Sequence, residues 1–229
     1  GGDLTSSRME KQMKLFIPIK HNSQRVSGKN FRDFGGMPLY QHCLKRFAAY
    51  EKYIDTDSDE ILAALEGVPG VTAYRRLPEQ EGDEVSVCDL ILRFVEEYCE
   101  SEDVVCQIHV TSPFLKPLTL ERAFEHMRDH DSVSGCNVVQ SRFWRREEYG
   151  FCPVNHNPMK LEQTQDLPEL YEENSAFYMF LAEVVMHTGN RIGKNPHFLS
   201  VEWPENLDID TEVEMRAALA LRKMMEEEK

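Results

Sequence analysis

Strand-like and helix-like segments alternate along most of the chain, and this alternation constrains the fold more than any other feature of the sequence. Runs rich in β-branched and aromatic residues predict strands over 14–19, 52–56, 71–74, 104–110, 132–139 and 176–180. Apolar residues recur at helical spacing within 87–98, 120–127 and 213–224. The alternation predicts an α/β fold with a mostly parallel sheet flanked by helices. Ligand sites of such sheets lie beyond the carboxyl ends of the strands.

Length and composition predict one globular domain. Of the 229 residues, 41% are hydrophobic, which is enough to bury a core. We expect a single domain over 1–229, with a disordered lead over 1–13. No run approaches the roughly 18 consecutive apolar residues that a membrane-spanning helix needs, and the start lacks the apolar core of a signal peptide. Six cysteines without a CxxC pair indicate free thiols and a cytoplasmic location.

Charge is distributed unevenly along the chain. The formal net charge of −14 argues against nucleic acid and anionic membranes as partners, because the summed field would repel both. Residues 1–50, however, hold nine Lys or Arg and three Asp or Glu, a net charge of +6, whereas residues 51–229 carry −20. A basic segment in an acidic chain indicates a local anion-binding site.

The basic residues concentrate in segment 20–32, KHNSQRVSGKNFR, directly after the first predicted strand. The segment has four cations and no acid: Lys20, Arg25, Lys29 and Arg32. Gly28 permits backbone conformations closed to other residues, and Ser23 offers a hydroxyl group. The segment matches neither the GxxxxGK(S/T) nor the GxGxxG phosphate-binding pattern. Its composition leaves two interpretations open, a phosphate cradle and a solvated basic loop.

Segment 141–173 interrupts the alternation of strands and helices. It is rich in charged and aromatic residues, Pro and Asn, and it contains no clean periodic stretch. Because it is too long for an ordinary connection, we expect either a substrate lid or an arm that packs on a second subunit.

His126 and His130 lie four residues apart on a predicted helix. No nearby Cys or third His completes a zinc-binding set in the sequence. We therefore interpret the pair as part of a solvated helix face.

The basic segment also resembles the opening motif of a known family. KHNSQRVSGKN (20–30) followed by FGGMPL (34–39) is similar to the signature of the nonulosonate cytidylyltransferases, the CMP-sialic acid synthetase family, which is close to R-x-x-S-x-R-x-x-x-K-N. Five further segments match family motifs in the family's order: IDTDSDEI (54–61), RRLPEQEGDEVSVCDLI (75–91), HVTSPFL (109–115), NSAFY (174–178) and LDIDTEVE (207–214). Six matches in order over nearly the whole chain favour the phosphate cradle over the solvated loop.

The resemblance implies a fold, a reaction and a set of site residues. It implies a Rossmann-like nucleotide-diphospho-sugar transferase architecture in which CTP is coupled to a nonulosonic acid, a sialic-type keto-sugar acid, by in-line attack of the anomeric hydroxyl on the α-phosphate. The nucleotide would be held by Lys20, Ser23, Lys29, Asn30, Arg76, Thr111 and Ser112, with Arg75 as an alternative to Arg76. The sugar would be met by Gln163, Gln165, Asn174, Phe177 and Tyr178. The expected catalytic residues are Lys20, Lys29 and Asp210, and the expected assembly is a homodimer formed through 141–173.

Asp208 and Asp210 precede the last predicted helix and have two interpretations. Judged alone, an Asp in this position is an N-cap, and Thr211 with Glu214 also fits a capping box. Matched to the family's IDIDTE motif, the two aspartates are expected to bind Mg²⁺, because hard divalent ions prefer carboxylate oxygens together with substrate phosphates. Both interpretations hold together if one Asp caps the helix and the other binds the metal.

Several positions depart from the family pattern. Lys20 replaces an Arg, which keeps the charge but loses the bidentate fork. His109 replaces a Gln, and Ser175 replaces a Gly. Arg191 and Ile192 lie where sialic-acid-using members have an aromatic pair. The last difference widens the choice of sugar to related nonulosonates such as legionaminic or pseudaminic acid.

Three alternatives stand beside a nonulosonate cytidylyltransferase. A 3-deoxy-manno-octulosonate cytidylyltransferase is the runner-up, although Asn30 after Lys29 differs from the aliphatic residue usual in that branch. A glycosyltransferase with a DxD motif at 208–210 ranks lower, because only one predicted helix follows where an acceptor-binding region is expected. A catalytically silent relative is motivated by the departures at Lys20 and Ser175.

Overall fold

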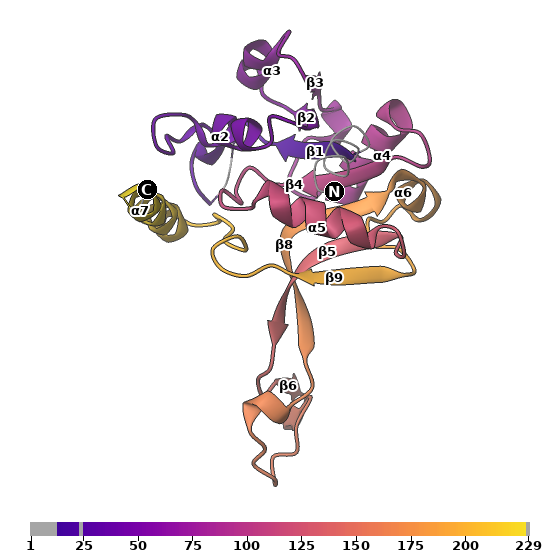
Figure 1. Cartoon of the computed structure of the whole chain (residues 1–229), viewed down its shortest axis with the longest axis vertical. Helices are drawn as coiled ribbons and strands as arrows, with labels where there is room; N and C mark the ends of the chain where they lie inside the picture. Colours follow the sequence, from indigo (N-terminus) through magenta and orange to yellow (C-terminus); the bar gives the residue numbers. More distant parts are fainter. Residues whose placement is uncertain (1–12, 23–24, 228–229) are drawn as a thin grey trace, which may run out of the picture.

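A seven-stranded sheet forms the centre of the protein (Figure 1). The computed structural model describes residues 13–22 and 25–227. The strands follow the order β3 (Val71–Arg75), β2 (Glu51–Thr56), β1 (Met13–Ile19), β4 (Val104–Ile108), β8 (Leu170–Leu181), β5 (Ser132–Val139) and β9 (Pro196–Ser200). Neighbouring strands are parallel except that β8 is antiparallel to β4 and β5. The predicted α/β fold with a mostly parallel sheet is confirmed.

Helices cover both faces of this sheet. The α-helices of the described residues are α2 (Leu39–Arg46), α3 (Asp59–Leu65), α4 (Val87–Tyr98), α5 (Pro117–His126), α6 (Ala182–Thr188) and α7 (Glu212–Glu227). Short 3₁₀ helices occur at η1 (Lys29–Phe31), η2 (Pro78–Gln80) and η3 (Thr164–Asp166). One hydrophobic cluster takes its helical residues from α2, α3, α5 and α7, and a second cluster takes them from α4 and α6.

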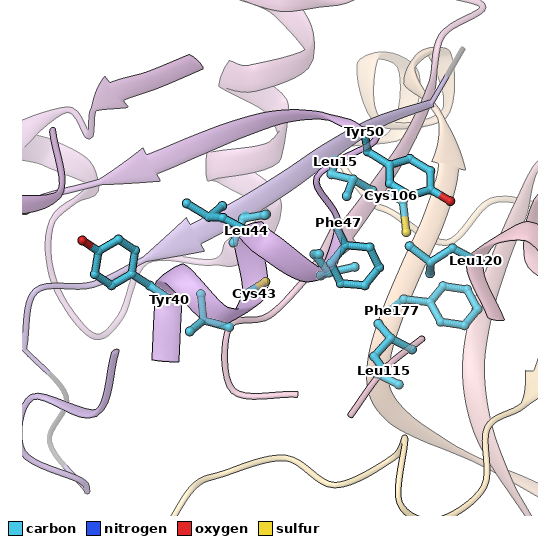
Figure 2. Close-up of a cluster of buried hydrophobic side chains, with 14 of the residues drawn as sticks. Leu15, Tyr40, Cys43, Leu44, Phe47, Tyr50, Cys106, Leu115, Leu120 and Phe177 are labelled. Atoms are coloured by element: carbon cyan, nitrogen blue, oxygen red, sulfur yellow. The ribbon is translucent and has the colours of Figure 1, made fainter. Parts of the chain in front are cut away.

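Alternation along the strands divides side chains between the two clusters. In β8, Phe177 belongs to the cluster on the α2 side, as Figure 2 shows, whereas the next residue, Tyr178, belongs to the cluster on the α4 side. In β1, Leu15 and Phe16 divide in the same way, and Phe16 packs on Phe94 with ring centroids 5.1 Å apart. Neighbouring residues of one strand therefore have different surroundings, which decides which side chains can reach a ligand.

The structure adds elements and moves boundaries relative to the sequence pattern. Helices α2, α3 and α6 were not predicted, because each has eight residues or fewer, which is too few turns for a helical period to be recognised. Strand β9 was not predicted because its sequence, PHFLS, contains no β-branched residue. Strand β8 begins at Leu170, before the predicted start at 176. Met13, expected in the disordered lead, is buried in β1. The rest of that expected lead, residues 1–12, lies outside the described residues.

Two further expectations concern membranes and thiols. No helix in the described part of the chain is long and apolar enough to cross a membrane. All six cysteines are free, as predicted.

Segment 141–173 forms an arm. Strands β5 and β8 continue past the body of the sheet as a two-stranded ribbon, and β6 (Trp144–Glu147) and β7 (Gly150–Pro153) pair beyond it as an antiparallel hairpin. Figure 1 shows the arm projecting from the body. Every residue of β6 is exposed. Because the segment projects from the body and does not fold over it, it corresponds to the expected arm and not to a lid.

Three histidines form a stacked cluster at the end of α5. The ring centroids of His126 and His197 are 4.0 Å apart, and His130 lies 5.0 Å from His197. His126 and His130 are both partly exposed, and β9 adds a third histidine beside them that the sequence analysis did not include. Burial lowers the pKa of His197, and the neighbouring His126 and His130 lower it further.

Acid should destabilise the fold through this cluster. Because folding lowers the pKa of His197, this contribution to stability is present above the unfolded value of about 6.5 and is lost as pH falls through the folded pKa. We expect His197→Gln to lose less free energy of unfolding than the wild type when pH drops from about 7 to about 5, measured by urea denaturation. His187→Gln, on the exposed end of α6, is the control and should follow the wild type. Equal pH dependence in all three proteins would contradict the prediction.

Candidate active site

A polar cavity opens beyond the carboxyl ends of β1 and β4, the place where ligands of parallel sheets bind. Its volume is about 360 Å³. The lining residues come from β1 and the loop after it, the loop after β4, the loop after η2 and the segment before α7: Pro18, Lys20, Asn22, Arg25, Lys29, Asn30, Asp83, His109, Val110, Thr111 and Asp210. Cations and carboxylates from distant parts of the sequence thus meet in one place.

Lys20 stands at the start of the basic loop and is paired with the loop after η2. Its Nζ atom donates to Asp83 Oδ1 at 3.0 Å and to the Gly82 carbonyl oxygen at 3.2 Å. The side chains of Lys20 and Asp83 are 40% and 59% exposed, so this ion pair is weak and can exchange partners. Ser23, another expected phosphate ligand, lies outside the described residues.

Lys29 and Arg25 approach the acidic segment before α7. Lys29 Nζ donates to the Ile209 carbonyl oxygen at 3.1 Å and lies 3.8 Å from Asp210 Oδ1. Arg25 Nη1 lies 3.6 Å from Asp210 Oδ2. Gly28, with φ of +57°, makes the left-handed turn that leads into η1 and so points Lys29 at this segment. Two cations therefore flank one carboxylate without a short hydrogen bond to it.

Asn30 fixes the shape of the basic loop. Its side chain is buried, and Nδ2 donates to the Lys20 carbonyl oxygen at 2.8 Å. This bond ties the two ends of the loop together across ten residues. Asn30 therefore lines the cavity as expected, with its amide group already engaged by the protein backbone.

The predicted capping box at the start of α7 is confirmed. Thr211 Oγ1 accepts a hydrogen bond from the Glu214 N–H at 3.2 Å, and Glu214 Oε2 accepts from the N–H groups of Asp210 at 2.7 Å and Thr211 at 2.8 Å. The hydrogen bond from the Asp210 backbone is the main cause that lowers the pKa of Glu214. Because Thr211 and Glu214 satisfy the helix end, the two aspartate side chains are free for another role.

Asp208 and Asp210 fit a divalent cation. Asp208 Oδ1 is buried and has no hydrogen-bond partner among the residues that the structure describes, a costly state for a carboxylate oxygen unless a cation faces it. Asp210, two positions later in the sequence, lines the cavity. Carboxylate oxygens are ligands that Mg²⁺ prefers. The described residues contain no group of three or more His, Cys, Asp or Glu placed to hold a metal, so further ligands would come from substrate or water.

His109 contributes a neutral side chain to the cavity wall. Burial lowers its pKa, and the positive charges of Arg191 and Lys29 lower it further, while the Asp208 carboxylate acts in the opposite direction. Its Nε2 atom lies 3.2 Å from Nε2 of Gln107. The residue that departs from the family's Gln is therefore part of the site.

Arg76, an expected phosphate ligand, is not among the residues that line the cavity. Its side chain is buried, and Nε donates to Asp55 Oδ1 at 2.5 Å. Burial raises the pKa of Asp55, an effect that the Arg76 guanidinium opposes. The alternative, Arg75, lies on the surface and binds the Asp57 carbonyl oxygen and the Asp59 carboxylate. Both arginines therefore support the end of β3.

Thr111 and Ser112 have different positions although they are neighbours. Thr111 lines the cavity, and its carbonyl oxygen accepts a hydrogen bond of 2.9 Å from the Ile209 N–H. Ser112 is buried and does not line the cavity, contrary to expectation, because the loop turns inward and its carbonyl oxygen accepts from Arg46 Nη2 at 3.0 Å.

The expected sugar-binding residues lie outside the cavity lining. Gln163 and Gln165 are exposed on the arm, where the two side chains bond to each other at 2.7 Å. Asn174 lies in β8 and is engaged by the fold, since its Nδ2 donates to Asn137 Oδ1 at 3.0 Å and to the Val201 carbonyl oxygen at 3.2 Å. The structure therefore does not gather these three side chains at one point.

Phe177 and Tyr178 point to opposite faces of β8. Phe177 is fully buried in the core cluster of Figure 2, which corrects its expected contact with the sugar. Tyr178 is 2% exposed, but its hydroxyl group belongs to a polar cluster and donates to Glu173 Oε2 at 2.7 Å.

Sequence reasoning left Asn22, Asp83 and His109 out of the site, although all three line the cavity. Asn22 and His109 lie within matched motifs in the loops that follow β1 and β4, and this position could have indicated that they belong to the site. Asp83 lies in the matched segment 75–91, but no pattern in that segment shows that its carboxylate meets Lys20.

The position of Arg76 yields a prediction about stability. Arg76→Met should lower the free energy of unfolding by about 3–5 kcal/mol, because it leaves the buried Asp55 carboxylate without its cation. Arg75→Met, which removes an exposed ion pair, should cost less than about 1 kcal/mol. Urea denaturation measures both values. An Arg76→Met protein as stable as the Arg75→Met protein would contradict the structural role.

Comparison with known proteins identifies relatives of this chain. Residues 15–220 match the family model described as Cytidylyltransferase. N-acylneuraminate cytidylyltransferase A of Danio rerio is 28% identical over 224 residues, which cover 91% of this chain and 51% of that protein. CMP-N,N'-diacetyllegionaminic acid synthase of Legionella pneumophila is 25% identical over 228 residues, which cover 92% of this chain and 96% of that protein. The chain thus spans about half the length of the first relative and nearly all of the second.

A solved structure shares the fold. CMP:2-keto-3-deoxy-manno-octonic acid synthetase complexed with CTP matches with a TM-score of 0.64 at 16% identity, over 93% of this chain and 99% of that chain. The family model covers most of the chain, including the basic loop, the loop after β4 and the acidic segment before α7. The chain therefore belongs to the cytidylyltransferase family.

Proposed function

We propose that this chain transfers the CMP moiety of CTP to a nonulosonic acid and releases pyrophosphate. Family membership supports the proposal, as do the names of two relatives, an N-acylneuraminate cytidylyltransferase and a CMP-N,N'-diacetyllegionaminic acid synthase. The observation that carries it is the meeting of Lys20 and Lys29 with Asp210 in one cavity; two positions before Asp210, the buried Oδ1 atom of Asp208 has no hydrogen-bond partner among the described residues. Cations suited to a triphosphate thus lie beside carboxylates suited to a divalent ion.

The basic loop would bind the phosphates by exchanging partners. Lys20 would leave Asp83 and Lys29 would turn from Asp210 toward nonbridging phosphate oxygens, since both ion pairs are partly exposed or longer than a hydrogen bond. Asn30 would keep the loop in shape through its bond to the Lys20 backbone. Thr111 would present its side chain from the opposite wall.

The reaction would be an in-line displacement at the α-phosphorus. The anomeric hydroxyl oxygen of the sugar acid bonds to phosphorus and loses its proton to solvent water, and the bond from phosphorus to the oxygen that bridges to the β-phosphate breaks, so that pyrophosphate leaves. Asp208 and Asp210 would hold Mg²⁺, which when bound neutralises phosphate charge as a Lewis acid. Lys29 would stabilise the charge that develops on the phosphates, and positioning of this kind is most of what a protein contributes to phosphoryl-type transfer.

We predict pyrophosphate release that depends on Mg²⁺ when CTP is offered with a panel of nonulosonic acids. Asp210→Asn should lower kcat by about 100-fold or more, because the variant loses a ligand charge at the reacting phosphate. Glu212→Gln is the matched control. It removes a carboxylate two residues away that pairs with Arg32 on the surface, and it should keep kcat within about twofold.

The panel also separates the alternatives. Release with 3-deoxy-manno-octulosonate and with none of the nonulosonic acids would replace the proposed sugar. Tight CTP binding without release for any sugar would identify a catalytically silent relative. Release with UTP in place of CTP would refute the cytidylyl assignment.

We also propose that the arm joins two copies of the chain in a homodimer. Several of its large apolar side chains are exposed: Tyr149 at 93%, Met159 at 91%, Leu161 at 90%, Phe151 at 67% and Trp144 at 50%. Exposed apolar and aromatic side chains gathered on one segment mark interaction surfaces. The resemblance of 141–173 to a dimerisation region supports a second copy as the partner.

The wild type should sediment as a dimer at micromolar concentration. A Phe151→Asp, Leu161→Asp double variant should sediment as a monomer, because the interface would have to bury two unpaired carboxylates. Leu118→Asp, at a 61% exposed position on α5, is the control and should remain a dimer. A monomeric wild type, or a dimer that survives both arm substitutions, would refute the assembly.

We propose a cytoplasmic location for the reaction. All six cysteines are free, which suits a reducing compartment.

A further inference from the structure

A chain of polar side chains leads from the cavity wall into the sheet between β4 and β8. His109 lines the cavity, and its Nε2 atom lies 3.2 Å from Nε2 of Gln107, a buried residue of β4. Gln107 Oε1 accepts a hydrogen bond of 2.6 Å from Arg191 Nη1. The guanidinium group of Arg191 is thus connected to the cavity through two side chains.

The guanidinium group of Arg191 lies flat on an aromatic ring. Its Cζ atom is 3.5 Å from the ring centroid of Tyr178. Among the residues that the structure describes, the bond to Gln107 is the one hydrogen bond that this guanidinium makes. A guanidinium has five N–H donors, and Arg191 is half-buried rather than enclosed. Arg191 is therefore held in place while most of its donors stay available to a ligand.

The support beneath Arg191 contains a strained residue. The Tyr178 hydroxyl group donates to Glu173 Oε2 at 2.7 Å and lies 3.3 Å from Ser175 Oγ. Ser175 has a φ of +58° and is the one non-glycine residue with positive φ in the described part of the chain. Glycine would relieve the backbone strain but would remove the hydroxyl group that meets Tyr178. Strain of this kind concentrates at ligand sites.

The proposed reaction needs a cation on the sugar side of the cavity. The carboxylate of a nonulosonic acid is bonded to the anomeric carbon, whose hydroxyl group attacks the α-phosphorus, so this carboxylate comes close to the phosphates. The two anions repel each other unless a cation faces the carboxylate. Lys20 and Lys29 lie on the basic loop and are suited to the phosphates, whereas Arg191 lies in the loop between α6 and β9 and stacks on Tyr178 of β8. A planar guanidinium matches a carboxylate with parallel N–H donors.

We propose that Arg191 is a specificity-determining residue that binds the carboxylate of the sugar acid, while Tyr178 and Gln107 hold its guanidinium group in place. This inference rests on the proposed function, because it names the group of that substrate which the protein recognises. The substrate is then an acid with an ionised carboxylate beside the anomeric carbon, and a neutral sugar of the same shape is rejected.

The test compares an acid with its neutral counterpart in two variants. The ligands are the best-accepted nonulosonic acid of the panel and its C1 carboxamide, which keeps the shape and removes the charge. Arg191→Met should raise the KM for the acid about 10- to 100-fold, while Arg191→Lys, which keeps the charge without the fork, should fall between this variant and the wild type. The KM for CTP should stay within about twofold, and the KM for the carboxamide within about threefold.

Arg93 provides a matched control for the loss of an arginine stacked on a tyrosine. Its Cζ atom lies 5.0 Å from the ring centroid of Tyr74, and its Nε donates to Glu97 at 2.9 Å on α4. Neither Arg191 nor Arg93 lines the cavity itself, but Arg191 is connected to the lining residue His109 through Gln107. Arg93 instead contacts Glu97, Arg75 and Tyr74, none of which lines the cavity. Arg93→Met should therefore leave the KM for the acid and for CTP unchanged, even if it lowers stability.

The outcomes separate this inference from the proposed function. An unchanged KM for the acid in Arg191→Met, or an equal loss for acid and carboxamide, would overturn the role of Arg191. If no protein releases pyrophosphate, calorimetric titration of both ligands in the presence of CTP decides. Preference for the acid in the wild type and its loss in Arg191→Met would support the carboxylate site while refuting the transfer reaction. No binding of the acid to the wild type would overturn both.

Discussion

The position of the acidic pair depends on the buried residue between its members. Ile209 is fully buried, and its N–H donates to the Thr111 carbonyl oxygen at 2.9 Å, which fastens the segment before α7 to the loop after β4. With Ile209 anchored, Asp210 lines the cavity and Asp208 acts electrostatically on the cavity wall. The capping box of α7 takes up the neighbouring N–H groups, so neither carboxylate is used by the helix end. Packing of one aliphatic side chain thus prepares two charged ones for chemistry.

Residues that directly follow strands were predicted well from the sequence. Lys20, Lys29 and Asn30 after β1 and Thr111 after β4 all line the cavity. The family resemblance implied their role, and the periodicity indicated where the strands before them end, although not the order of the strands in the sheet. The capping box was predictable because its hydrogen bonds join residues at most four positions apart. The stacked histidines were not, since β9 is distant in sequence from α5.

Side chains inside strands or at their edges were harder to predict, because one step along the chain changes the face that a residue occupies. Phe177 enters the core, whereas Tyr178 supports Arg191. Arg76 and Asp55 lie in the matched segments 75–91 and 54–61. Their side chains form a buried ion pair, so these two motif residues contact each other within the fold. The positive φ of Ser175 explains why the family has a glycine at this position. Neither composition nor hydrophobic periodicity can predict a positive φ.

The ion pair between Lys20 and Asp83 lowers the affinity of the cavity for an anion, because the anion has to compete with the Asp83 carboxylate for Lys20. Asp83 and Asp210 act as internal counter-ions, which cover cations of the basic loop before any ligand arrives. A phosphate that takes Lys20 gains a cation but lies close to the Asp83 carboxylate, and like charges at short distance repel each other. A divalent ion, or displacement of the loop that carries Asp83, has to offset this repulsion. The affinity of this site for an anion therefore depends on the exchange of counter-ions. An estimate from the number of lysines alone would be too high.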